Sequence, residues 1–350
     1  MLKRISSPHA HGSLDTAGLM RTLCLAALPG LAAITWFYGW GTLINLAWAI
    51  ALALIMEAAI MRLRGRPLSP YIGDYSAVVT AGLLALSLPP YTPWWATLVG
   101  IAFAIPIAKH LYGGLGYNPF NPAMVGYVVL LISFPVPMVE WASPRGLAEQ
   151  IPGPLTALEI IFLGTAPPDG VTGATALDIL KQNTSLTLAQ LYTSEPLFAA
   201  GRIAAAGSEW VNLAFLAGGL WLLWRRVYSW HAPVGMLASL LVLSTLFYDN
   251  GSSASLGSPL FHLFTGATML GAFFIITDPV SGCTSNLGRL LFGIGAGTLT
   301  FVIRAWGNYP DAVAFGVLLM NFAAPLLDYY SLPRTYGHAK RRQVRIRKNQ

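Results

Sequence analysis

The sequence predicts an all-α polytopic membrane protein, because it is long, apolar and poor in charge. Of its 350 residues, 55% are hydrophobic and only 10% are charged, whereas a soluble globular domain carries about 25% charged residues. The 11 Trp and 14 Tyr residues are of the two types that favour the membrane interface. The net charge is +7, and the basic residues lie at the ends of apolar segments and in the tail. This distribution favours contact with membrane lipid and not with nucleic acid.

Ten apolar segments approach the length of about 20 residues that a spanning helix needs. They run roughly over Leu19–Tyr38, Thr42–Met61, Tyr75–Leu88, Trp94–Leu111, Ala123–Val139, Val211–Trp224, Ala232–Tyr248, Pro259–Ile276, Leu290–Ile303 and Ala312–Tyr329. The third, sixth and ninth are short, so broken or partly inserted helices are alternatives there. Ten crossings place both termini on one side of the membrane.

The distribution of the basic residues indicates which side of the membrane holds the termini. With the termini in the cytoplasm, 17 of the 21 Lys and Arg residues fall on the inner side, as the positive-inside rule requires. The four that remain outside are Arg145, Lys181, Arg202 and Arg304. We therefore predict a multi-pass protein with cytoplasmic termini, and with the long loop of residues 140–209 outside the cytoplasm.

This assignment divides the chain into four parts. A membrane half of five helices (1–139) precedes the long loop (140–209), and a second five-helix half (210–330) precedes a basic cytoplasmic tail (331–350). GYVVLL at Gly126–Leu131 resembles GVLLMN at Gly316–Asn321, which lies 190 residues later. Five helices per half would invert one half relative to the other, so we interpret this similarity as two inverted five-helix repeats. Chance similarity between apolar segments is the alternative.

The long loop contains the most specific motif. Its core is Asp169-Gly170-Val171-Thr172-Gly173-Ala174-Thr175, followed by a segment that reads as a helix with Thr175 at its N-cap. The small residues leave the backbone open to a large planar or phosphorylated group. A hydroxyl beside the free N–H groups of a helix start favours a phosphate. An ordinary helix cap in a loop is the alternative.

The motif resembles the Asp-x-x-Ser/Thr-Gly-Ala-Thr sequence that bacterial flavin transferases recognise. In proteins with this motif the last Thr is joined to FMN through a phosphoester. The resemblance therefore implies covalent FMN on Thr175, with Asp169, Thr172, Gly173 and Ala174 completing the recognised sequence. It also implies a flavin transferase as a partner during maturation.

Three further stretches extend the resemblance from residue 6 to about residue 338. SSPHAH near the start, GYNPFNPAMVGYVVLL at Gly116–Leu131 and TDPVSGCTSNLGR at Thr277–Arg289 resemble the NqrB/RnfD family. That family comprises the D component of Rnf (Rsx) ion-translocating ferredoxin:NAD oxidoreductases and the B component of the sodium-pumping NADH:quinone oxidoreductase. The resemblance implies an electron-transfer subunit in the bacterial inner membrane, coupled to Na⁺ or H⁺ movement. It also implies partner subunits A, B, C, E and G.

Several polar residues within apolar segments are weaker candidates. Glu57 lies inside the second segment, where an ionisable group is costly and is a candidate for an ion path; pairing with Arg62 or Arg64 near the interface is the alternative. Asn118, Asn121 and Asp278 lie in turns rich in helix breakers, which favour a second pocket for an ion or a non-covalent flavin such as riboflavin. These turns could equally only cap helices. We expect Arg304 and Asp328 at the interface, and no metal site.

Two other functions would fit the helices. A small-solute channel or transporter would suit ten helices and an inverted repeat, and a membrane anchor for soluble subunits would suit any apolar bundle. Neither predicts the flavin motif. The chain carries no dinucleotide-binding fingerprint after a strand, and its two Cys residues are too few to hold an iron–sulfur cluster. We therefore expect that it does not oxidise NADH by itself.

Overall fold

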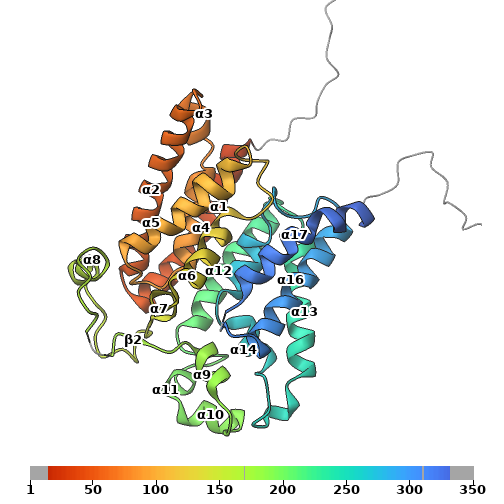
Figure 1. Cartoon of the computed structure of the whole chain (residues 1–350). Coiled ribbons are helices and arrows are strands. Elements are labelled where there is room, and N and C mark those ends of the chain that lie inside the picture. The colour runs from red at the N-terminus through yellow and green to blue at the C-terminus, as the bar shows by residue number, and fades with distance from the viewer. Residues whose placement is uncertain (1–14, 169, 310, 332–350) are drawn as a thin grey trace, which may run out of the picture.

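The computed structural model describes residues 15–168, 170–309 and 311–331 as a bundle of helices with one small two-stranded sheet (Figure 1). The N-terminal half contains α1 (Thr16–Tyr38), α2 (Gly41–Leu63), α3 (Leu68–Ile72), α4 (Ser76–Ser87), α5 (Trp94–Ala102), the π-helix η1 (Phe103–Leu111), α6 (Pro122–Ser133) and α7 (Pro135–Val139). The C-terminal half contains α12 (Ser208–Trp224), α13 (His231–Leu246), η3 (Asp249–Gly251), α14 (Pro259–Phe264), α15 (Thr268–Leu270), η4 (Gly271–Ile275), α16 (Asn286–Trp306) and α17 (Val313–Ser331).

Each of the ten predicted segments contains helix, and five are long and apolar enough to cross a membrane by length and composition. These five are α1, α2, α5 continued by η1, α16 and α17. The eighth segment is interrupted between α14 and α15, where Gly266 adopts a left-handed φ of +59°. The fifth divides after Phe134, because Pro135 cannot continue the hydrogen bonding of α6. We expected the ninth segment to be short, but α16 extends over 21 residues. These helices make the chain a membrane protein.

The two halves pack helix to helix. Gly218 of α12 lies against the backbone carbonyl of Ala26 in α1, so close that a Cβ at position 218 would collide with it. Small residues permit such close approach between membrane helices. At the other contact, the side-chain oxygen of Asn321 in α17 accepts the N–H of Asn121 at the start of α6 at 3.0 Å. The first helices of the two halves, α1 and α12, therefore meet, and so do α6 and α17, which belong to the fifth and tenth predicted segments.

The loop of residues 140–209 has its own structure. It contains β1 (Trp141–Ala142), α8 (Pro154–Leu158), η2 (Glu159–Leu163), β2 (Thr172–Gly173), α9 (Ala176–Gln182), α10 (Leu188–Ser194) and α11 (Pro196–Ala199). The three helices α9–α11 share a small core that includes Leu177, Leu191 and Phe198. The apolar stretch in η2 packs on the membrane half, where Phe162 meets Trp48 of α2 edge to face. The loop is thus a folded unit on one end of the bundle (Figure 1).

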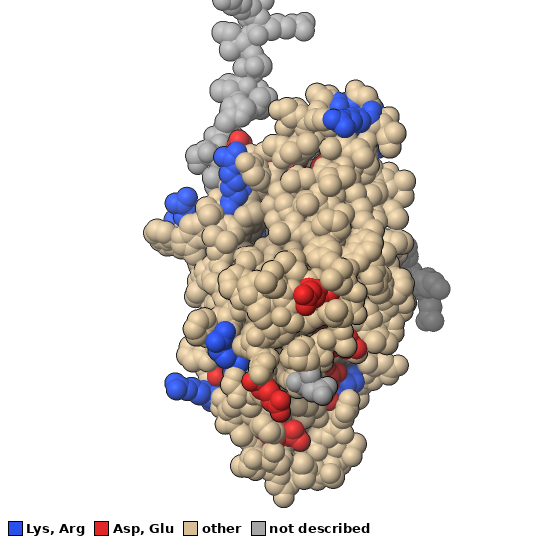
Figure 2. All heavy atoms as spheres, turned by 90° about the vertical axis from the view of Figure 1, so that its left-hand side faces the viewer, with Lys and Arg blue, Asp and Glu red and all other residues tan. Residues whose placement is uncertain are grey.

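The start of α1 and the end of α17 both lie at the opposite end of the bundle from this loop (Figure 1). On the face in Figure 2, Lys and Arg side chains occur at both ends of the molecule, and Asp and Glu gather mainly towards the loop end. A broad zone with few charged residues separates the two ends, as a lipid-facing surface requires. Lys3, Arg4 and the basic tail used in the charge argument lie outside the described residues.

Candidate functional site

Thr175 occupies the N-cap of α9, as the sequence predicts. Its hydroxyl donates to Asp178 Oδ2 at 2.5 Å, and its backbone N–H donates to the same oxygen at 3.1 Å. The backbone N–H of Asp178 donates back to the Thr175 hydroxyl oxygen at 3.2 Å. This reciprocal capping box satisfies donors at the helix start and fixes the direction of the Thr175 side chain. We did not single out Asp178 from the sequence.

The other motif residues form the approach to Thr175. Thr172 and Gly173 make strand β2, which pairs antiparallel with β1. A Cβ at Gly173 would lie 3.1 Å from Ser143 Oγ, so the strand pairing favours a small residue there. Gly170 adopts a left-handed φ of +77°, which glycine takes without strain. Gly173 and Ala174 are exposed, so the backbone before Thr175 is accessible. Asp169 lies outside the described residues.

A large cavity of about 310 Å³ lies where the two membrane halves meet the folded loop. Its lining is mostly apolar and comes from α1, α6, α12, α17 and the start of α9. Thr175, Asp178 and Asp311 supply polar groups at its wall, whereas Thr172 is not part of the lining. We refer to this space as the outer cavity. Its size and its few polar groups are those of a small-molecule or cofactor pocket.

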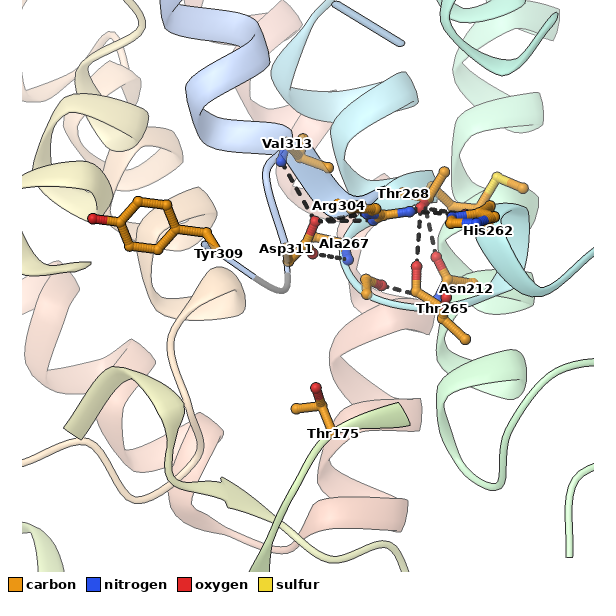
Figure 3. A network of polar contacts seen from close by, with 12 residues as sticks. Thr175, Asn212, His262, Thr265, Ala267, Thr268, Arg304, Tyr309, Asp311 and Val313 are labelled. Carbon is orange, nitrogen blue, oxygen red and sulfur yellow. Dashed lines mark hydrogen bonds and ion pairs between the residues drawn. The ribbon is translucent and has the colours of Figure 1, made fainter. Parts of the chain in front are cut away.

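A buried polar network borders the outer cavity (Figure 3). Arg304 Nη2 lies 2.9 Å from Asp311 Oδ1, and the guanidinium also donates to the His262 carbonyl and to Thr268 Oγ1, both at 3.0 Å. Arg304 stands in the last turn of α16, near the helix end as we expected, but its side chain is only 4% exposed and lies inside the protein. Burial is tolerated because the Asp311 carboxylate and two oxygen acceptors satisfy the guanidinium.

The break between α14 and α15 belongs to the same network. The Asn212 side chain of α12 donates to the carbonyls of Phe264 and Gly266 and accepts the N–H of Met269. Asp311 accepts the N–H of Ala267 at 2.7 Å. Backbone groups that the helix interruption leaves free therefore find side-chain partners, which is the condition for irregular backbone at membrane depth.

Burial and nearby contacts shift the pKa values of two charged groups near the loop, Asp311 and Lys181. Burial alone would raise the pKa of the Asp311 carboxyl, but the Arg304 guanidinium and the donated N–H groups outweigh it and hold that pKa below the usual 3.8. Burial lowers the pKa of the Lys181 ammonium, and the Asp178 carboxylate partly offsets this. Lys181 Nζ donates to the Tyr309 carbonyl at 2.9 Å, which ties α9 to the segment that precedes α17.

Glu57 lies in a second buried cluster, toward the opposite end of the bundle. Lys109 Nζ lies 2.7 Å from Glu57 Oε1 and also 2.7 Å from Ser76 Oγ. His110 Nε2 is 3.3 Å from the same Glu57 oxygen, without hydrogen-bond geometry. Glu57 Oε2 has no partner among the described residues. The alternative pairing of Glu57 with Arg62 or Arg64 is wrong, because the carboxylate forms its ion pair with Lys109 of η1.

The three residues proposed for a second pocket lie around one small cavity. Asn118, Asn121 and Asp278 line one cavity of about 50 Å³, together with Ser76 and Lys109. Asn121 caps α6, as the capping alternative expects, and its amide also donates to the Ile275 carbonyl at 3.3 Å. A cavity of this size holds a few water molecules and is smaller than a three-ring flavin. We therefore assign no flavin to it.

The turn that follows η4 contains Asp278. Burial raises the pKa of the Asp278 carboxyl, and hydrogen bonds that include the Ser281 hydroxyl partly oppose this rise. Asp328 does not extend freely into the interface but accepts the N–H and hydroxyl of Thr284. Within residues 15–168, 170–309 and 311–331, no group of three or more His, Cys, Asp or Glu side chains is placed to hold a metal ion.

The bundle, the outer cavity and the motif at its wall define a membrane protein with a cofactor-sized site. The sequence model of the "NQR2, RnfD, RnfE family" matches residues 3–337, and the chain belongs to that family. A Pseudomonas aeruginosa protein described as the D component of an ion-translocating oxidoreductase complex is 61% identical over 340 residues, which cover 97% of each chain. Proteins with the same description from Cellvibrio japonicus and Vibrio vulnificus are 56% identical over 346 residues and 53% identical over 355 residues. Those alignments cover 98% and 95% of this chain, and 97% and 98% of the relatives.

Proposed function

We propose that this chain is the membrane electron-transfer subunit of a redox-driven ion pump, an Rnf-type ferredoxin:NAD oxidoreductase that moves Na⁺ or H⁺. In this proposal FMN is bound to Thr175 through a phosphoester. Family membership over residues 3–337 and relatives described as components of ion-translocating oxidoreductase complexes support the general role. The observation that carries the cofactor assignment is the position of Thr175 at the wall of a cavity of about 310 Å³.

The residues present fit such a cofactor. The apolar lining of the outer cavity from α1, α6, α12 and α17 would cover a planar ring system and exclude water from it. Thr175 supplies the anchoring oxygen, and the exposed Gly173 and Ala174 leave room for a transferase to reach it. FMN supplies the redox chemistry when bound, and the protein supplies position and electrostatics. We therefore expect the chain to hold one flavin on Thr175.

The membrane arrangement belongs to the same proposal. Ten crossings in two inverted five-helix repeats agree with the pairing of first helices through Gly218 and of last helices through Asn121 and Asn321. The two described ends of the chain lie at the end opposite the loop (Figure 1). With the positive-inside rule, this supports cytoplasmic termini, a periplasmic flavin loop and a bacterial inner membrane. The partners are then subunits A, B, C, E and G, and a flavin transferase during maturation.

Glu57 is the residue that we propose for an ion path. Glu57 Oε2, which has no partner among the described residues, is a buried carboxylate oxygen that could accept a cation or a proton. Ionisable residues inside membrane helices are costly and are therefore candidates for a functional site. In the assembled complex, Glu57→Gln should keep the flavin and lower the number of ions moved per electron. Unchanged coupling would remove Glu57 from the path.

Flavin attachment is tested in a denaturing gel. The chain is co-expressed with a bacterial flavin transferase, and the band is examined for flavin fluorescence and for the added mass of FMN. We expect fluorescence in the wild type and in Thr172→Ser, which keeps the recognised sequence, and none in Thr175→Ala, because Thr175 and not Thr172 lines the outer cavity. A wild-type band without fluorescence or added mass would leave the channel or the membrane anchor as the better hypothesis.

A further inference from the structure

We propose that Asp178 is a catalytic residue for flavin attachment, acting within the acceptor protein as the base that removes the proton from Thr175. This inference rests on the proposed attachment of FMN to Thr175. It is carried by the hydrogen bond of 2.5 Å from the Thr175 hydroxyl to Asp178 Oδ2. Asp178 is thus in contact with the oxygen atom that would react.

The chemistry requires such a base. A threonine hydroxyl forms a phosphoester with FMN only from an activated donor, an FMN anhydride such as FAD. Thr175 Oγ1 attacks the phosphorus of the FMN half, the P–O bond to AMP breaks, and AMP leaves with the bonding electron pair. The hydroxyl proton passes to Asp178 and from there to water, so no electron is gained or lost. In protein kinases, an aspartate of the enzyme accepts the proton of the substrate hydroxyl.

The carboxylate is held in place independently of the hydroxyl. The backbone N–H of Thr175 donates to the same Asp178 Oδ2 at 3.1 Å. When the hydroxyl gives up its proton and its oxygen turns to the phosphorus, this backbone contact still fixes the carboxylate. Both side chains are half-buried and follow the exposed Gly173 and Ala174, so a transferase can approach without unfolding α9.

Helix capping does not require a carboxylate. The next helix in the loop, α10, begins with the same box, in which Thr187 is the N-cap and Gln190 is the third helical residue. In α10 the acceptor is a neutral amide, since the Thr187 hydroxyl and N–H both donate to Gln190 Oε1 at 3.0 Å. A neutral side chain is therefore sufficient for capping. Besides a favourable charge at the helix start, a carboxylate at position 178 adds the ability to take a proton.

The experiment measures the rate of attachment. The full-length chain in detergent is mixed with purified bacterial flavin transferase, FAD and Mg²⁺, and flavin is followed by in-gel fluorescence and intact mass. Asp178→Asn and Asp178→Gln keep an acceptor for the Thr175 N–H but cannot take the proton. We expect both to lower the turnover rate at least about 100-fold, within the range for general-base catalysis. The KM for the chain should stay near that of the wild type.

The matched control is Gln190→Ala, which breaks the neighbouring box without touching Thr175 and should be modified at the wild-type rate. Attachment to Asp178→Asn or Asp178→Gln at the wild-type rate would overturn the role of Asp178, and so would a slowdown seen only in KM or shared by Gln190→Ala. Wild-type protein that gains no flavin would instead overturn the attachment to Thr175 itself.

Discussion

Lys109 Nζ lies 2.7 Å from Glu57 Oε1, with both side chains at most 2% exposed. Lys109 is on the π-helix η1, which contains Pro106, and Glu57 is on α2. Breaking a buried ion pair from one side leaves an uncompensated charge. The pair therefore fixes η1 against α2 next to the proposed ion site.

We expect Glu57→Gln to lower the stability of the chain in detergent by about 3–5 kcal/mol, because Lys109 then remains buried without its counter-charge. Lys109→Met should cost a similar amount. The double variant Glu57→Gln/Lys109→Met should recover most of the loss, since two neutral side chains leave no charge unpaired. Thermal unfolding midpoints in one detergent measure this. Additive losses in the double variant would contradict the pairing.

The second buried pair gives a prediction about pH. Asp311 accepts from Arg304 and from the Ala267 N–H, and these contacts hold its pKa below 3.8 despite burial. A carboxylate with a lowered pKa stabilises the folded state fully above its unfolded pKa, and that contribution is lost as the pH falls through the folded pKa. We expect the difference in unfolding midpoint between wild type and Asp311→Asn to be constant from neutral pH down to about 5.

Below about pH 3.8 this difference should shrink toward zero. At neutral pH we expect Asp311→Asn to cost about 1–3 kcal/mol, less than for a fully enclosed pair, because the Asp311 side chain is 21% exposed. Arg304→Lys at neutral pH is a useful companion, since it keeps the charge but cannot reach the His262 carbonyl and Thr268 together in the same geometry. A difference that grows as the pH falls would contradict the ion pair.

The sequence was informative where one segment determines the structure, and silent where two distant segments meet. Apolar runs located helix in all ten predicted segments, and the motif placed Thr175 at an N-cap. Lys109 and Glu57 are 52 residues apart, and each alone reads as a costly charge in an apolar run. Only the folded bundle brings them together, so the sequence could not predict the partner of Glu57.

Arg304 and the broken helix show the same limit. Arg304 reads as interfacial because it stands near a helix end, but its acceptors come from the α14–α15 break and from Asp311. The signal that could have found the pair was a second ionisable residue, Asp311, only seven positions away. The break itself follows from Gly266 at φ +59° and from the Asn212 amide that satisfies it. Gly266 is visible in the apolar run, but its left-handed φ and its partner Asn212 are not.

The contact between the two halves depends on a glycine. A Cβ at Gly218 would collide with the Ala26 carbonyl and lie 3.2 Å from Phe274 Cζ. We expect Gly218→Ala to push α12 away from α1 and to cost about 1–3 kcal/mol, as overpacking does. Gly82→Ala in α4 is the control, because a Cβ there would lie 3.9 Å from Leu46 Cδ1, an ordinary contact. Equal unfolding midpoints for the two variants would show that the halves are not held at this point.

The outer cavity makes a prediction about the attached flavin. Ala314 of α17 is 4% exposed and lines the cavity, so Ala314→Phe would fill part of the space proposed for the flavin ring. Thr175 is the N-cap of the separate loop helix α9, and flavin attachment should therefore persist. The ring would then remain in water. We expect iodide to quench the flavin fluorescence of Ala314→Phe several-fold more strongly than that of the flavinylated wild type.

Leu319→Phe is the control for this measurement, because Leu319 lies on the same helix but is 52% exposed and does not line the cavity. Its flavin should be quenched as in the wild type. If iodide quenches the flavin of Ala314→Phe no more than that of Leu319→Phe, then the ring does not enter the outer cavity. Thr175 would in that case carry its flavin on the surface of the loop, where another protein of the complex would have to cover it to exclude water from the redox reaction.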